Sequence, residues 1–201
     1  PAHNACLLIF LCAAGCGQDS AGLAKASKVP PDAPVLFAEI TAQSGIHFLH
    51  DSGANGKYFM PEHVGSGAAL FDFDNDGRLD VYLVQNGGTN SQSRNQLFQQ
   101  QGDGTFRNTS EGSGLDVAGY GMGLAVGDVN NDGWADVLVT EYGAARLFLN
   151  LTGGKFLELP ATSGIDNPRW ATAASFFDFD RDGWLDVVIA NYVDLIPTHE
   201  C

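Results

Sequence analysis

One nine-residue pattern occurs three times, and this repetition constrains the fold more than any other feature of the chain. The pattern D-x-[DN]-x-D-G-x-x-D begins at Asp72, Asp128 and Asp178, so successive copies start 56 and 50 residues apart. Each copy runs directly into an apolar segment, which reads VYLV, VLVT or VVIA. A period of about 50 residues is typical of repeat architectures in which one supersecondary unit recurs. We therefore interpret the chain as an array of repeats.

Each repeat predicts four short antiparallel strands. Apolar or alternating runs are separated by Gly-containing turns, which is a strong hairpin signal. Four antiparallel strands in about 50 residues are the unit of a β-propeller blade. The sequence thus predicts an all-β fold: a β-propeller of four-stranded blades, present as two complete blades and the first two strands of a third. The candidate strands of the complete blades are 67–74, 80–86, 95–101, 105–110, 123–130, 136–142, 145–150 and 155–160.

Small residues begin each repeat, at 67–69, 121–123 and 173–175. The innermost strand of a blade is crowded against the propeller axis, so small side chains are expected there. The β-branched, turn-rich pattern also excludes a helical solenoid. Both observations favour the propeller.

A second signature, Phe at the start and Ser-Gly-aliphatic at the end, occurs at 37–46, 106–115 and 156–165. In the last two copies the Phe precedes the first Asp by 22 residues, but in the first copy by 35, which indicates an insertion at 47–62. Residues 35–41 match the fourth strand of a repeat, yet no first three strands precede them. We expect an unpaired outer strand there, which would complete the last blade of a longer chain and close the ring. Exposed strand edges would make the open arc prone to aggregation.

The net charge of −14 argues against nucleic acid or an anionic membrane as the main partner, because phosphate binding needs a basic surface. The three patterns contain 11 of the 24 acidic residues. Three bound divalent cations would add six charges and change the net charge from −14 to −8. The acidic residues are therefore concentrated at specific sites, where cations are expected to bind.

The residue types of the pattern favour calcium. Positions 1, 3 and 5 supply carboxylates, Gly at position 6 supplies a sharp turn, position 7 offers a backbone carbonyl, and position 9 completes the shell. Only hard oxygen donors are present, which favours calcium over zinc or copper, and calcium tolerates irregular angles better than magnesium does. An EF-hand is excluded because position 12 is Leu83, Val139 or Ile189 instead of Glu. The sequence predicts three Ca²⁺ sites.

The loops and strands resemble the FG-GAP or VCBS repeats of integrin α-subunit propellers. The insertion is similar to the opening of bacterial proteins of the ASPIC/UnbV, cartilage-acidic-protein-like group, and the resemblance covers residues 35–201. It implies a carbonyl ligand at position 7 of each loop and a weaker second site, where Asn130 replaces an aspartate. The ligands that the resemblance implies are Asp72, Asp74, Asp76, Arg78 and Asp80; Asp128, Asn130, Asp132, Trp134 and Asp136; and Asp178, Asp180, Asp182, Trp184 and Asp186.

The N-terminal residues predict export. Residues 5–15 form an apolar run of 11, too short to span a bilayer but suited to a signal-peptide core. The Ala-Ala-Gly-Cys sequence at 13–16 resembles a bacterial lipobox, in which Cys16 would be lipidated. Cleavage by the ordinary signal peptidase and a buried core helix are the alternatives. The chain begins at Pro1 without Met, so we expect the true N-terminus to lie upstream.

These features divide the chain into a signal peptide with a possible lipobox (1–16), a flexible Ala-, Ser- and Pro-rich linker (17–34) and propeller blades (35–201). The expected location is the cell envelope, as a lipoprotein, or outside the cell. Membrane contact is expected only through the lipid anchor.

Other candidate residues are fewer. His47 and His50, with Glu62 and His63, suggest a functional site in the insertion, against the alternative of a structural loop that packs over the blade. Trp134 and Trp184 are expected in the core between blades. No set of nucleophile, base and orienting group can be assembled from the sequence.

The expected function is therefore binding without catalysis. We interpret the chain as an exported, calcium-stabilised propeller that recognises a protein or a glycan. The alternative is a calcium-dependent extracytoplasmic hydrolase or lyase, which a converging cluster of His50, Glu62 and His63 would favour.

Overall fold

The computed structural model describes residues 37–193, and the chain divides into two compact units, residues 1–45 and 46–201. In the first unit the described residues contain the short helix α1 (Thr41–Ser44), which ends at Gly45 with a φ of 80°. The predictions for the signal peptide, the linker and Cys16 lie outside the described residues.

The prediction of a strand at 35–41 is wrong for residues 37–41, the part that the structure describes. Residues 37–40 form no strand, and Thr41 begins α1. In the complete blades the equivalent outer strand is only three residues long, and a turn follows at once. A strand this short needs a hydrogen-bonded neighbour to hold it. The later part of the signature does recur, because Gly45, Gly114 and Gly164 share a left-handed backbone, with φ of 80°, 89° and 101°.

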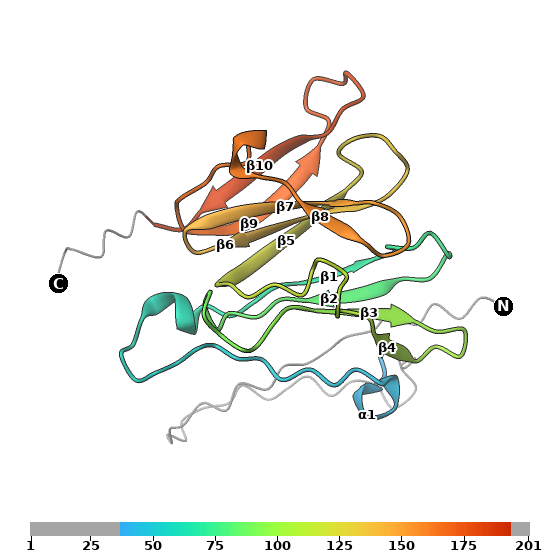
Figure 1. The fold of residues 1–201 in the computed structure, drawn as a ribbon, viewed down its shortest axis with the longest axis horizontal. Coiled ribbons are helices and arrows are strands. Elements are labelled where there is room, and N and C mark those ends of the chain that lie inside the picture. The colour runs from blue at the N-terminus through green and yellow to red at the C-terminus, as the bar shows by residue number, and fades with distance from the viewer. Residues whose placement is uncertain (1–36, 194–201) are drawn as a thin grey trace, which may run out of the picture. The chain divides into compact units, whose positions relative to one another are not determined.

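The second unit contains three antiparallel sheets, which lie one above another in Figure 1. Two sheets have four strands in sequence order, and the third is a two-stranded hairpin. This confirms the predicted all-β architecture of two complete blades and the first two strands of a third. The strands are β1 (Ala68–Phe71), β2 (Asp80–Leu83), β3 (Gln96–Gln100) and β4 (Phe106–Asn108); β5 (Gly121–Gly127), β6 (Asp136–Glu141), β7 (Ala144–Asn150) and β8 (Phe156–Glu158); and β9 (Ala171–Phe177) and β10 (Asp186–Asn191).

The three repeats share one register around the aspartate pattern. The pairs Phe71 with Asp80, Gly127 with Asp136, and Phe177 with Asp186 close the first hairpin of each sheet. The last aspartate of each pattern is therefore the first residue of the second strand. We call the patterns at 72–80, 128–136 and 178–186 the first, second and third aspartate loops.

The core lies between the sheets, and the period-2 pattern of the strands explains it. Successive side chains of a strand point to opposite faces of its sheet. Val137 and Val139 of β6 accordingly pack in the cluster shared with the first blade, which includes Tyr82. Leu138, between them, packs toward the third sheet with Ile189. All of β2 and β6 is buried, because each of these strands lies inside its sheet with packing on both faces.

The first strands of the sheets approach one another closely, which explains their small residues. A Cβ added at Gly123 would lie 2.6 Å from the carbonyl oxygen of Thr172, and one at Gly67 would lie 3.0 Å from that of Met122. A side chain at Gly123 would therefore force β5 away from β9. The expected crowding of the innermost strands is confirmed.

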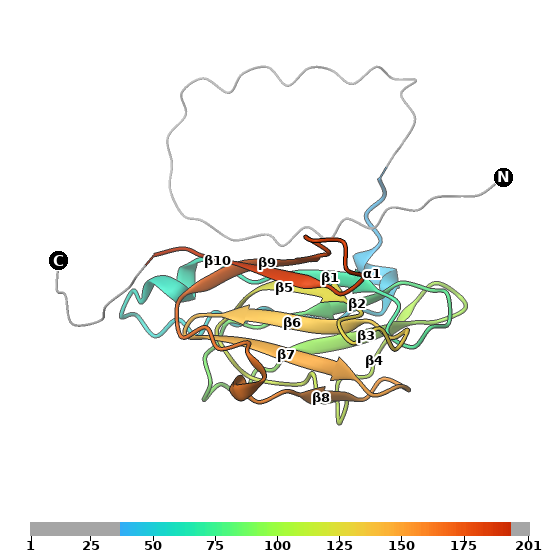
Figure 2. The same ribbon diagram turned by 90° about the horizontal axis from the view of Figure 1, so that it is seen from above.

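Two 3₁₀ turns, η1 (Met60–His63) and η2 (Ala161–Ser163), complete the described secondary structure. The insertion around η1 is tied to the end of β2: the amide of Asn86 donates to Asp51 O at 3.2 Å. The two directions of view in Figures 1 and 2 show this segment beside the first sheet. Within residues 37–193 no helix has the length and apolarity needed to cross a membrane.

Candidate metal sites

The three aspartate loops share one backbone conformation. Position 4 is left-handed in each, with φ of 57° at Asn75, 56° at Asn131 and 65° at Arg181. The glycine at position 6 is also left-handed, with φ of 84°, 87° and 89° in the three loops. Glycine adopts this conformation without steric cost, which explains its place in all three copies.

The first carboxylate of each loop is held by backbone amides. Asp72 accepts hydrogen bonds from the amides of Asp76 (3.0 Å) and Gly77 (2.8 Å). Asp128 and Asp178 make the same pair of bonds in their loops, at 2.8 to 3.1 Å. The carboxylate at position 5 accepts the amide of position 7 at 2.8 to 2.9 Å in every copy. The loops are thus organised by their own aspartates before any ligand is considered.

In the first loop, three carboxylates converge. Asp72, Asp74 and Asp80 each present an oxygen within 4.8 Å of the others. Oδ2 of Asp74 accepts a hydrogen bond from Gln99, whereas its Oδ1 is buried without a hydrogen-bond partner. The side chain of Asp76, also predicted as a ligand, lies outside this group of three and forms an ion pair with Arg78.

The other two loops differ from the first. Asp178, Asp180 and Asp182 of the third loop present oxygens within 4.8 Å of one another. In the second loop position 3 is Asn130, so three carboxylates cannot converge in the same way. The side-chain Nδ2 of Asn130 donates to Asp132 Oδ2 at 2.9 Å, and its Oδ1 accepts from the backbone N–H of Asp132 at 3.1 Å.

The aspartate at position 9 has a structural role that the sequence did not reveal. Asp80 accepts the amides of Phe73 (3.1 Å) and Gln100 (2.7 Å), so it joins its own loop to the third strand of the blade. Asp136 does the same in the second blade. Burial raises the pKa of Asp80 to about 6, and the charges of Asp74 and Asp76 add to the rise.

These observations fit a calcium ion. Calcium accepts hard oxygen ligands in irregular arrangements, and the converging groups of the first and third loops offer only such donors. A buried carboxylate oxygen without a partner, as at Asp74, is costly unless something compensates it. A cation at this position would satisfy Oδ1 and reduce the repulsion among the converging carboxylates.

Adjacent loops are joined by a hydrogen bond that recurs. The side-chain Nδ2 of Asn75 donates to the backbone oxygen of Gly133, and that of Asn131 donates to the backbone oxygen of Gly183, both at 3.0 Å. In each case position 4 of one loop contacts position 6 of the next. The left-handed backbone at position 4 suits Asn, which tolerates φ above zero better than most residues. Each loop therefore helps to hold its neighbour.

This contact leads to a prediction. Asn131→Gly should lower the free energy of unfolding by about 0.5 to 1.5 kcal/mol, the typical contribution of one hydrogen bond, because Gly keeps the backbone conformation but lacks the amide. Arg181→Gly is the matched control, since Arg181 has the same backbone conformation without an inter-loop bond among the described residues. The measurement is urea unfolding of both variants. An equal loss in the two would show that the bond contributes nothing.

The candidate residues of the insertion do not converge. His50 is hydrogen-bonded to Ser66 at 2.8 Å, Glu62 is buried and contacts Asn55, and the ring of His63 stacks on Tyr58. Among the described residues, the groups of carboxylate or imidazole ligands that converge are those of the first and third aspartate loops. The cluster that would favour an enzyme is not formed by these side chains.

The expected places of the tryptophans were wrong. Trp134 is half-buried and Trp184 is 54% exposed, so neither belongs to the core. Position 7 lies in the loop, before the second strand of each sheet begins. Between the blades lies Trp170 instead, which is fully buried and contacts Tyr142 and Tyr192 edge to face.

Comparison with known proteins agrees with this geometry. The FG-GAP-like repeat family matches residues 72–139 and 128–189, which together span more than half of the chain. Cartilage acidic protein 1 of Xenopus tropicalis is 36% identical over 94 residues. That match covers 45% of this chain and 14% of the relative, so the chain spans only a small part of the relative's length. The resemblance to FG-GAP repeats is confirmed.

Proposed function

Because the chain belongs to the FG-GAP-like repeat family, we propose that it is an exported, calcium-binding β-propeller module that binds a protein or a glycan. The observation that carries the calcium proposal is the convergence of carboxylates in the first loop around an unpartnered, buried oxygen of Asp74. The repeat of the loop conformation in all three copies supports it.

In this proposal the ions have a structural role. Asp72, Asp74 and Asp80 would hold one ion, and Asp178, Asp180 and Asp182 would hold another. The second loop would bind more weakly, because Asn130 carries no charge. A bound ion supplies positive charge at the corner between the first and second strands, where it offsets the repulsion of the carboxylates. The loops at the other end of each blade then remain available for recognition.

Export and the absence of catalysis belong to the same proposal. The apolar run at 5–15 and the lipobox-like residues up to Cys16 support an exported protein held in the cell envelope or secreted. The separate contacts of the candidate side chains in the insertion, in which His50 and Glu62 are hydrogen-bonded to different partners and His63 stacks on Tyr58, support a module that binds a ligand without transforming it.

Terbium luminescence tests the metal sites. Terbium replaces calcium and emits when a nearby indole is excited, and position 7 is Trp in the second and third loops but Arg78 in the first. We expect indole-sensitised emission that is lost in the double variant Trp134→Phe, Trp184→Phe and that excess calcium displaces. Trp170→Phe is the matched control, because Trp170 directly precedes β9, at the end of that strand away from the third aspartate loop. Emission that vanishes only when Asp72 and Asp74 are replaced would contradict the assignment.

A further inference from the structure

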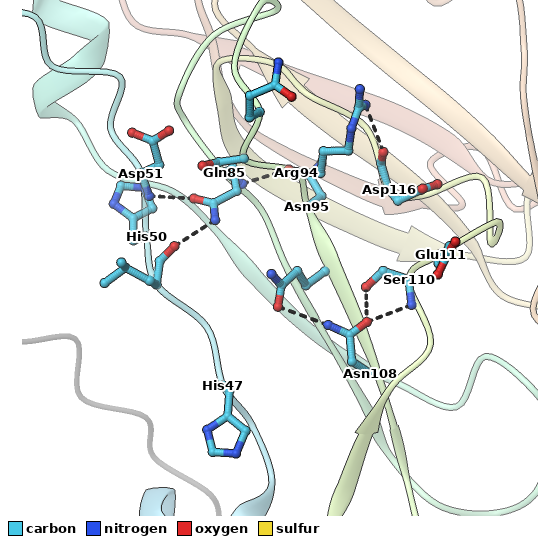
Figure 3. Close-up of a pocket in the computed structure, with 14 residues that line it drawn as sticks. His47, His50, Asp51, Gln85, Arg94, Asn95, Asn108, Ser110, Glu111 and Asp116 are labelled. Carbon is cyan, nitrogen blue, oxygen red and sulfur yellow. Dashed lines mark hydrogen bonds between the residues drawn. The ribbon is translucent and has the colours of Figure 1, made fainter.

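A polar pocket of about 690 Å³ lies at the end of the first blade away from its aspartate loop (Figure 3). β2 begins at the loop, and Gln85 lies beyond its other end, where Gln96 begins β3. Fourteen residues line the pocket. Its volume falls in the range typical of sites for small ligands.

The wall formed by the insertion is held in place by one side chain. Gln85 accepts a hydrogen bond from the amide of Asp51 at 2.7 Å and donates to Leu49 O at 2.9 Å. Figure 3 shows this side chain between the insertion and the first blade. The carboxylate of Asp51 is also engaged, since it accepts from the amide of Gly53 and from Ser91. This wall is therefore preorganised.

The opposite wall is equally ordered. Asn95 accepts the amide of Gln85 at 2.7 Å and donates to Tyr82. Asn108 donates to Gln96 at 3.2 Å and accepts from Ser110 at 2.7 Å. The side-chain amides of Asn95 and Asn108 are thus engaged within the protein, so other residues of the lining must supply contacts to a ligand.

The charged groups that remain available are of two kinds. Arg94 uses one nitrogen to donate to Asp116 O at 3.2 Å, which leaves most of its guanidinium N–H groups as donors. The carboxylates of Glu111 and Asp116 are acceptors, and neither forms an ion pair within residues 37–193. Donors and acceptors therefore stand side by side at the pocket, as the labelled side chains in Figure 3 show.

The charge and polarity of the lining narrow the class of ligand. Asp51, Glu111 and Asp116 outnumber Arg94 as formal charges, which disfavours anionic ligands such as phosphates or uronic acids. Leu49 is the apolar side chain of the lining, so a hydrophobic ligand would find little to contact. A cationic ligand would gain from the carboxylates but would lie beside the guanidinium group of Arg94, whereas a neutral hydroxyl group can accept from Arg94 and donate to a carboxylate.

A neutral, polyhydroxylated ligand fits all of these conditions. A hydroxyl group both donates and accepts, so adjacent hydroxyls can engage a guanidinium donor and a carboxylate acceptor at once. We propose that this pocket binds a neutral oligosaccharide, with Arg94, Glu111 and Asp116 as its main polar contacts. The inference rests on the proposed role of the module in ligand binding and names the site and the ligand class. It does not depend on calcium, because the aspartate loops lie at the other end of the blades.

The test is calorimetric titration of the full chain with neutral, amino-sugar and uronic-acid oligosaccharides, and with a lysine-rich peptide. We expect binding of a neutral oligosaccharide that weakens about tenfold or more in Arg94→Ala and in Asp116→Ala, as the loss of a hydrogen bond to a charged group implies. Arg107→Ala and Asp166→Ala are matched controls, because both residues are exposed and lie outside the pocket lining. All four side chains are at least partly exposed, so the variants should fold.

Several outcomes would overturn the inference. These are no binding of any neutral oligosaccharide, tighter binding of the uronic acid or the peptide, and a loss in the control variants equal to that in the pocket variants. The double variant Asp178→Asn, Asp180→Asn separates the two proposals, since it should lose the terbium signal of the third loop and keep the oligosaccharide affinity. Terbium binding without oligosaccharide binding would refute the pocket alone, and the reverse would refute the metal sites alone.

Discussion

Asp136→Ala should lower the free energy of unfolding by about 2 to 6 kcal/mol, because it leaves two buried amide donors without an acceptor at about 1 to 3 kcal/mol each. The side chain is fully buried and accepts the amides of Val129 at 2.9 Å and Asn150 at 2.8 Å. It thereby joins the second aspartate loop to the end of β7. Burial also raises the pKa of Asp136, which means that the buried charge opposes folding in part. We therefore expect a loss nearer the lower end of the range.

Urea unfolding in excess chelator measures this effect without any contribution from metal. Asp186→Ala is the matched control: it has the same position in the third loop, but Asp186 is exposed and accepts one amide, that of Phe179, at 2.8 Å. Asp136→Asn should be intermediate, since it keeps one acceptor oxygen. It also preserves the test if the alanine variant does not fold. Equal losses in Asp136→Ala and Asp186→Ala would mean that the buried hydrogen bonds do not carry the stability.

Calcium should raise the melting temperature substantially, and chelator should reverse the rise. A ligand that binds only the folded state stabilises it by about 2.7 kcal/mol per site at 100 times Kd. For a chain of about this size each kcal/mol corresponds to about 2 to 4 °C, so each occupied site should add about 5 to 10 °C. The physical reason is that the converged carboxylates exist only after the strands on both sides of the loop have formed.

Calorimetric scans with calcium, with magnesium and with excess chelator provide the measurement. Magnesium should have a smaller effect, because it prefers a near-ideal octahedron. The variant Asp178→Asn, Asp180→Asn should lose part of the calcium effect and retain the contribution of the first loop. Identical melting curves in calcium and in chelator would show that the loops are turns without bound ions.

Local patterns were enough to predict the blades. Each strand has a short apolar or alternating run, and each turn contains a glycine that suits a left-handed backbone, as Gly77 and Gly133 do. These signals lie within a few residues of the structure they specify. The same holds for the loop conformation, in which position 1 contacts positions 5 and 6 of its own loop.

Contacts between distant residues could not be predicted in this way. Asn75 and Gly133 are 58 positions apart, and Asn131 and Gly183 are 52 apart, yet they meet because consecutive blades stack with the same register. The recurrence of Asn at position 4 was the available signal. His47 and His50, from which the sequence suggested a site in the insertion, do line the pocket, but its other wall could not be predicted, since Gln85 contacts an insertion that begins more than thirty residues earlier, at 47.

The sequence by itself determined the repeat, the number and order of strands within the blades, the aspartate loops and their oxygen donors, because all of these depend on residues close in the chain. Only the tertiary structure decided what each aspartate contacts: Asp76 pairs with Arg78, Asp80 converges with Asp72 and Asp74 and also accepts a backbone amide of the third strand, and Asp136 is buried as such an acceptor. It also decided that Thr41 belongs to a helix and that Trp184 is exposed. Burial and partner choice depend on which strands lie beside a residue, and that is a property of the packed blades.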